Sequence, residues 1–220
     1  MWNKIQRIYI WDTQVRPSWI HISSDLRWAT LAWLQAQWWT GIIYRFNSYI
    51  LNSNWLSPSW TNNDVAFIYK NIPQLDSNNK IEINLTGYST GNSTNNAVTG
   101  WAIASSVTAA PWIFQTGLRW SYTTWASPTL PQWIIYNDSW MATWPSTHSA
   151  WNLSIKMKIN LSTGLVEYNL SSPTSFSTSY TLSSSQLQAM LTYKNIGAFI
   201  QTHGTGNTAR IYTVSLTVEC

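Results

Sequence analysis

The sequence predicts an all-β protein that folds as a β-sandwich or jelly roll. Three observations favour this class: apolar and polar residues alternate over many short stretches, turn-forming clusters separate the stretches, and helical spacing is almost absent. The chain of 220 residues has the length of one ordinary all-β domain with a small N-terminal extension. No period of 20–50 residues repeats, so a solenoid is excluded.

The N-terminal part is less regular than the rest. Residues 4–10 alternate like a short strand, and residues 41–51 are strand-like. Residues 20–34 are ambiguous, because they mix β-branched residues with a helix-like leucine spacing. Residues 51–64 form a polar loop rich in turn residues. The chain is therefore divided into an N-terminal attachment segment with short strands, residues 1–60, and a jelly-roll sandwich, residues 61–220.

From residue 65 onward the pattern becomes regular. The strongest strand signal is residues 152–161, where every second side chain is apolar, and the turn Ser162-Thr163-Gly164 leads into a returning strand. The predicted strands are residues 65–69, 80–85, 97–105, 113–122, 132–136, 152–161, 165–170, 174–182, 195–201 and 209–218. One short helix is expected over residues 183–193, since a serine cluster can cap it and Leu187, Met190 and Leu191 share one face.

Charge and cysteine content narrow the class of protein. Charged residues make up 9% of the chain, and the net charge of +4 is not concentrated in a basic cluster. A nucleic-acid partner is therefore not expected. Cys220 is the single cysteine, which excludes a disulfide within the chain and a cysteine metal site. No apolar run reaches the length of a membrane span, and the start has no apolar signal region, so membrane insertion and secretion by a signal peptide are not expected.

Tryptophan is unusually frequent, with 17 Trp against 9 Gly. Six of the Trp end turn-forming clusters, where a positive φ favours glycine: Trp11, Trp19, Trp55, Trp60, Trp140 and Trp151. One interpretation, which these slots favour, is that several Trp are glycines encoded by UGA and misread, as in bacteria and phages that use UGA for Gly. It predicts that several of the six lie in loops and are poorly buried. The codons would decide.

The other interpretation is that the Trp are real and form aromatic binding surfaces. The best candidates for stacking on sugar rings are then Trp112, Trp120, Trp140 and Trp144, with Asn and Asp side chains nearby in sequence to supply directional hydrogen bonds.

The sequence contains no pattern typical of a catalytic or metal-binding site. The carboxylates are few, and no Glu-x-Asp-x-x-Glu run lies on one strand, so Glu82 and Glu167 are expected to be solvated surface charges rather than a glycosidase pair. His21, His148 and His203 lack ligand spacing. We expect no enzyme activity, no metal site and no cofactor, although a Ca²⁺ site built from scattered oxygen ligands stays open.

Two segments resemble known families. Five elements of the C-terminal part occur in a characteristic order: the strand over residues 80–85, the hairpin over 153–170, the Ser/Thr-rich strand over 175–182, the helix after it and the last strand over 211–218. Together they resemble a concanavalin A-like or laminin G-like jelly roll. That resemblance covers roughly residues 65–219. Residues 4–17 are similar to the opening of phage structural proteins, which normally have glycine where this chain has Trp11.

The phage resemblance implies a tail-fibre-like virion protein. Its N-terminus would dock on other virion proteins, with Arg16 and Pro17 as the candidate docking residues, and its jelly roll would face a host surface glycan. Fibre proteins are often homotrimers. The implied localisation is the virion. Two alternatives stay open: a stand-alone carbohydrate-binding module and a bacterial surface adhesin.

Overall fold

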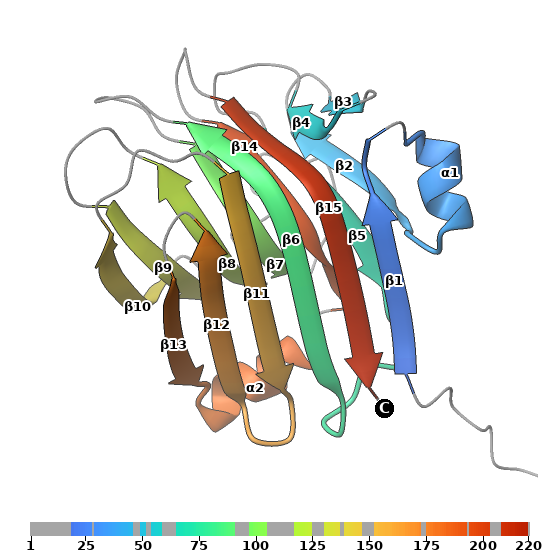
Figure 1. The fold of residues 1–220 in the computed structure, drawn as a ribbon. Helices are drawn as coiled ribbons and strands as arrows, with labels where there is room; N and C mark the ends of the chain where they lie inside the picture. Colours follow the sequence, from blue (N-terminus) through green and yellow to red (C-terminus); the bar gives the residue numbers. More distant parts are fainter. Residues whose placement is uncertain are drawn as a thin grey trace, which may run out of the picture.

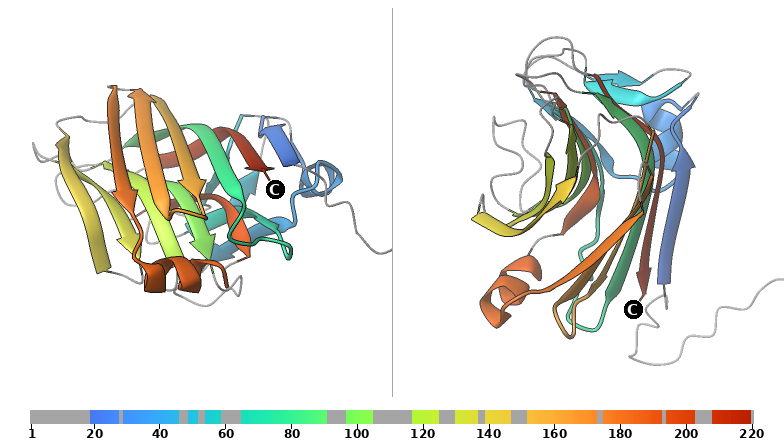
Figure 2. Two further views of the ribbon diagram at one scale, coloured as in Figure 1. Left: turned by 90° about the horizontal axis from the view of Figure 1, so that it is seen from below. Right: turned by 60° about the vertical axis from the view of Figure 1, so that its left-hand side comes forward.

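Two antiparallel sheets pack face to face in the computed structural model (Figure 1). The structure describes residues 19–27, 29–45, 49–51, 54–58, 65–90, 97–104, 117–124, 130–136, 139–146, 152–172, 175–192, 194–202 and 208–219. In Figure 1 the eight-stranded sheet lies in front of the seven-stranded sheet, and Figure 2 shows how the two curve over one another. The predicted all-β sandwich is confirmed.

The eight-stranded sheet has the order β13-β12-β11-β6-β15-β4-β3, and β1 also pairs with β15. Its strands are β1 (Trp19–Asp25), β3 (Tyr49–Leu51), β4 (Leu56–Pro58), β6 (Lys80–Thr90), β11 (Asn152–Asn160), β12 (Leu165–Ser172), β13 (Phe176–Thr181) and β15 (Thr208–Glu219).

The seven-stranded sheet has the order β10-β9-β8-β7-β14-β5-β2. Its strands are β2 (Gly41–Arg45), β5 (Val65–Asn71), β7 (Ala97–Ala104), β8 (Gly117–Thr124), β9 (Leu130–Tyr136), β10 (Ser139–Ser146) and β14 (Asn195–Thr202). Two short helices complete the described part, α1 (Leu31–Ala36) and α2 (Ser184–Met190). The helix α2 confirms the predicted helix, whereas the ambiguous stretch of residues 20–34 contains most of β1 and the start of α1.

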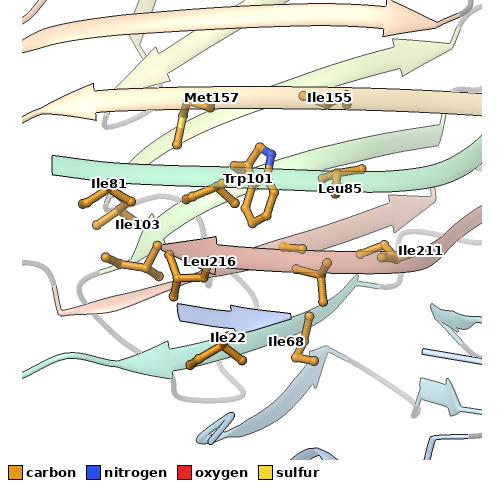
Figure 3. Close-up of a cluster of buried hydrophobic side chains, with 14 of the residues drawn as sticks. Ile22, Ile68, Ile81, Leu85, Trp101, Ile103, Ile155, Met157, Ile211 and Leu216 are labelled. Atoms are coloured by element: carbon orange, nitrogen blue, oxygen red, sulfur yellow. The ribbon is translucent and has the colours of Figure 1, made fainter. Parts of the chain in front are cut away.

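The core lies between the sheets and follows from the alternation in the sequence. In β11 every second residue is buried, as predicted, because one face of a strand packs inward and the other meets solvent. Figure 3 shows this cluster, with Met157 and Ile155 of the eight-stranded sheet near Trp101 of the other sheet. Trp101 is among the largest of the fully buried side chains.

The strands before residue 60 belong to the sandwich. β1 pairs with β15 along its whole length, from Trp19 opposite Glu219 to Asp25 opposite Thr213, and β2 pairs with β5 in the other sheet. The segment predicted to attach the protein therefore contributes strands to both sheets. Its attachment role stays a prediction, and the predicted strand over residues 4–10 lies outside the described residues.

Two strands lie where the sequence predicts none. β4 lies in the polar loop predicted over residues 51–64, and β10 covers residues 139–146, which begin in a cluster of turn residues. Pairing supplies the backbone hydrogen bonds that local composition cannot predict: β4 pairs with β15, and β10 pairs with β9.

Helix α1 ends on an unusual residue. Trp38 has a φ of +73°, and within the described part of the chain no other residue apart from glycine has a positive φ. The Trp38 amide donates to the Gln35 carbonyl at 3.0 Å, and the Trp39 amide donates to the Leu34 carbonyl at 3.1 Å. These two bonds form a Schellman motif, in which the position of Trp38 usually holds glycine. Trp38 is 73% exposed, so packing does not compensate for the backbone conformation.

Candidate functional site

The outer face of the eight-stranded sheet is polar. Glu82 lies in the middle of this face, with its carboxylate 2.8 Å from the Lys156 ammonium and 3.7 Å from that of Lys158. Partial burial opposes ionisation of Glu82, but hydrogen bonds from Lys156 and Asn84 outweigh it and lower its pKa. Glu82 is therefore a partly buried carboxylate that pairs with two lysines, whereas the sequence predicted a solvated surface charge.

A recess of about 400 Å³ opens on this face near the start of β15. We call it the Trp55 recess. It is lined by Arg27, Asn54, Trp55, Thr86, Tyr212 and Thr213. The residues come from four parts of the chain: the segment just after β1, the segment before β4, the middle of β6 and a bulge in β15.

The bulge explains why β15 contributes two successive side chains. The register between β15 and β6 shifts between Ile211 and Thr213, so Tyr212 is the extra residue. Inward and outward positions alternate normally on both sides of the bulge, and at the bulge both Tyr212 and Thr213 stay out of the core. The Leu26 amide donates to the Tyr212 carbonyl at 2.7 Å, which holds the segment after β1 against the bulge.

Trp55 is held in place by Arg210. The Arg210 guanidinium lies 3.7 Å from the centroid of the Trp55 ring and 5.6 Å from that of Tyr88. Strand pairing produces this arrangement, since Arg210 is opposite Tyr88 in the ladder and the residue after Trp55 is opposite Ile211. Arg210 covers one part of the Trp55 indole but does not line the recess. The recess therefore meets another part of the indole surface.

Arg27 forms a short-range ion pair at the rim. Its Nε donates to both carboxylate oxygens of Asp25 at 2.9 Å, and its Nη2 also contacts Asp25. The hydrogen bond from Arg27 lowers the pKa of Asp25, although partial burial acts against it. Both side chains are about half exposed. The pair keeps the guanidinium in a fixed orientation beside the recess.

A second, smaller recess of about 270 Å³ adjoins the first. We call it the Trp33 recess, and its lining residues are Asp25, Arg27, Ala29 and Trp33. Trp33 is in the first turns of α1 and is 42% exposed. Thr30 caps this helix by accepting a hydrogen bond from the Trp33 amide at 3.1 Å. Arg27 lines both recesses.

The Trp55 recess offers an aromatic surface bordered by neutral polar groups. Thr86 and Thr213 share a hydrogen bond of 2.6 Å between their hydroxyls, and Tyr212 and Asn54 add a phenol and an amide to the lining. Such a combination suits a small ligand that has one apolar face and several hydroxyls. It contains no paired carboxylates in a cleft, which glycoside hydrolysis requires.

Three of the four Trp predicted to bind glycan lie among the described residues. Trp120 lies in β8, opposite Trp101, and both Trp140 and Trp144 lie in β10. The intervening strand β9 separates them in the same sheet. Trp112 lies outside the described residues, as do the predicted docking residues Arg16 and Pro17. The glycan-binding and docking assignments stay predictions.

The sequence predicts no binding role for Trp55. Trp55 was grouped with the glycine-like slots, yet in the structure it is half-buried beneath Arg210. Trp19 and Trp140 of the same group lie in strands, where extended backbone suits any residue, so of the three described members only Trp55 has the loop position expected for several of the six. Trp11, Trp60 and Trp151 lie outside the described residues. Arg210 carries no functional signal in the sequence, although it alternates with buried residues in a strongly patterned strand.

The described ranges contain neither a cluster of metal ligands nor a helix suited to span a membrane. In this part of the chain no three His, Cys, Asp or Glu residues lie close enough together to hold a metal ion. His21 instead shares a hydrogen bond of 2.9 Å with the Thr217 hydroxyl across the β1–β15 ladder. No helix among these residues is both long enough and apolar enough to cross a membrane.

Comparisons with known proteins identify the fold. No family model matches the chain, and no curated protein sequence does. Lectin I from Ulex europaeus, in complex with the methyl glycoside of α-L-fucose, superposes with a TM-score of 0.65 at 12% identity, covering 92% of this chain and 99% of that one. Basic winged bean lectin with Tn-antigen gives 0.66 at 13%, covering 91% and 98%.

A bacterial protein superposes on this chain with a similar TM-score. A protein of unknown function from Shewanella oneidensis MR-1 gives a TM-score of 0.62 at 14% identity and covers 94% of this chain and 89% of that one. At such low identity these likenesses show the fold alone, and the fold is the concanavalin A-like jelly roll seen in legume lectins. The predicted fold is therefore confirmed.

Proposed function

We propose that the protein binds carbohydrate without catalysis and that the Trp55 recess is a sugar site. One observation carries the proposal: an indole fixed by Arg210 borders a recess of about 400 Å³ that is otherwise lined by hydroxyl, amide and guanidinium groups. A pyranose ring stacks its C–H face on an aromatic surface and directs its hydroxyls to polar groups around it. The recess falls in the size range of small-molecule sites.

The fold supports the same class of function. Several structurally similar proteins are lectins, and three of them were solved with galactose, N-acetylgalactosamine or a fucose glycoside. This support is by analogy of fold, since identity is 9–12% for these three. It favours a stand-alone carbohydrate-binding protein over a tail-fibre role.

A virion location is a separate proposal. It rests on the resemblance of residues 4–17 to the opening of phage structural proteins, with Arg16 and Pro17 as docking residues, virion proteins as partners and a homotrimer as the assembly. Genes for tail or capsid proteins beside this gene would support it, and their absence, together with a monomer in light scattering, would argue against it.

Misreading of UGA also remains a proposal, and the structure suggests where to test it. Trp38 has the backbone conformation that favours glycine, whereas Trp39 is buried and its indole donates to the Ser24 hydroxyl at 2.9 Å. We expect UGA at codon 38 and UGG at codons 39, 55 and 101. Finding UGA at codon 55 would remove the aromatic surface and overturn the sugar site.

The binding experiment starts with a glycan array and continues with calorimetry on the ligands found. Trp55→Ala is expected to weaken binding at least tenfold, because it removes the stacking surface. The matched control is Trp38→Gly, which removes an exposed indole that lines neither recess and should leave the affinity unchanged. An array without ligands, or equal loss in both variants, would overturn the proposal.

A further inference from the structure

The two recesses meet at Arg27, and each has one tryptophan in its lining. We infer that they form one extended site for a neutral oligosaccharide of at least two sugar rings, with Trp55 contacting one ring and Trp33 the next. This inference rests on the proposed function and deepens it, since it adds the size and charge of the ligand.

Trp33 has the properties of a second stacking surface. It is 42% exposed, whereas Leu34, the next residue of α1, is fully buried. The helix is fixed at both ends, by the Thr30 cap and by the bonds from Trp38 and Trp39 to the last carbonyls. Trp39 further anchors the end of the helix to β1 through Ser24. An exposed indole on a fixed backbone loses little conformational entropy when a ligand stacks on it.

The Asp25–Arg27 pair between the two Trp sets the charge preference. Asp25 occupies Arg27 Nε and contacts Nη2, while the guanidinium carries five N–H donors in total. The other donors and the carboxylate oxygens can serve ligand hydroxyls from both sides. Because its two charges compensate each other, the Asp25–Arg27 pair itself offers hydrogen bonds with little net field, and the nearby Arg210 charge is stacked on the Trp55 ring outside the lining of either recess.

The test measures affinity against ligand length by calorimetry. The probes are maltose, cellobiose and chitobiose series of one to four units, together with any ligand found on an array. For a bound series, affinity is expected to rise about three- to tenfold from one unit to two and to change little when salt is raised. Trp33→Ala should abolish this rise and leave the affinity for one unit unchanged.

Control variants separate the possible outcomes. Trp33→Gln tests the same surface with a residue of good helix propensity, so an effect seen in both variants is not a folding defect. Trp38→Gly should keep the full rise. If Trp55→Ala abolishes binding while Trp33→Ala keeps the rise, the extended site is wrong and the proposed function stands. If affinity falls steeply with salt, the neutral ligand is wrong. If no probe or array glycan binds, both proposals fail.

Discussion

The guanidinium of Arg210 lies 3.7 Å from the centre of the Trp55 ring, and this contact joins the last strand of the chain to a loop far before it in sequence. Tyr88 flanks the same guanidinium at 5.6 Å. A cation over an indole contributes about 0.5–1 kcal/mol at an exposed site and more where water is excluded. Arg210 thereby orients Trp55 before any ligand arrives.

Arg210→Gln should weaken sugar binding only indirectly, because the variant no longer holds the Trp55 indole in position. Arg210 does not line the Trp55 recess, so the expected loss comes from a less ordered indole and amounts to about three- to tenfold. Arg210→Lys keeps the cation and should recover part of the affinity. Calorimetry on all three proteins measures the effect. Equal affinities in wild type and Arg210→Gln would show that Trp55 needs no such support.

Gly197→Ala is expected to destabilise the fold severely. A Cβ on Gly197 would lie 1.8 Å from the carbonyl oxygen of Ile68, and this overlap involves backbone, so β14 and β5 would have to separate. We expect a loss of at least about 3 kcal/mol in the free energy of unfolding, or no folded protein.

The matched control for Gly197 is Gly41→Ala in β2. A Cβ there would meet only the Tyr69 ring, at 3.6 Å, which is ordinary van der Waals contact. Its free energy of unfolding should stay within about 1 kcal/mol of wild type in urea titrations. Similar losses at the two positions would contradict the packing of β14 on β5.

Trp38→Gly is expected to stabilise the protein. The left-handed conformation costs a residue with a Cβ about 1–2 kcal/mol, and glycine relieves this cost. The greater flexibility of glycine in the unfolded chain offsets part of the resulting gain in stability. The net gain should be about 0.5–1 kcal/mol, visible as a higher Tm in calorimetry. Trp33→Gly, inside α1, should instead lower the Tm, since glycine disfavours a helix interior.

Trp101→Ala should cost about 3–5 kcal/mol, because it empties a fully buried site between the sheets. Trp101→Phe should cost clearly less. The indole Nε1 of Trp101 is buried without a hydrogen-bond partner among the described residues, so phenylalanine removes an unsatisfied donor while it keeps most of the apolar volume. Chemical denaturation of both variants checks the order, and a costlier Phe variant would contradict it.

Glu82→Gln should change the acid sensitivity of the fold. The pKa of Glu82 is lowered in the folded state from 4.5, so its contribution is present above about that pH and is lost as the pH falls through the folded pKa. We expect the variant to lose under about 1 kcal/mol at pH 7 and the deficit to shrink as the pH is lowered below 4.5, as urea titrations would show. Glu167→Gln, on the exposed side of β12, is the control. A Glu82→Gln deficit that stays constant as the pH falls would show that the ion pairs are not its source.

Parts of the fold could be predicted because their signal is local. The hairpin of β11 and β12 has an alternating pattern and a glycine turn, where Gly164 has a φ of +71°. β4 and β10 could not be predicted, because their strand character comes from pairing with β15 and β9. The sequence predicts the glycan site at Trp112, Trp120, Trp140 and Trp144, whereas the Trp55 recess combines residues from four distant segments.

The sequence by itself determined the class of the fold, the inward faces of its strands and the low charge of its surface, since each depends on neighbours along the chain. Only the tertiary structure decided which tryptophans share an environment. Trp38 and Trp39 are adjacent in sequence, yet one is exposed with a strained backbone and the other is buried against Ser24. Trp55 and Arg210 are far apart in sequence and in contact in space. Pairing between distant strands makes this difference, because it fixes neighbours that no local pattern encodes.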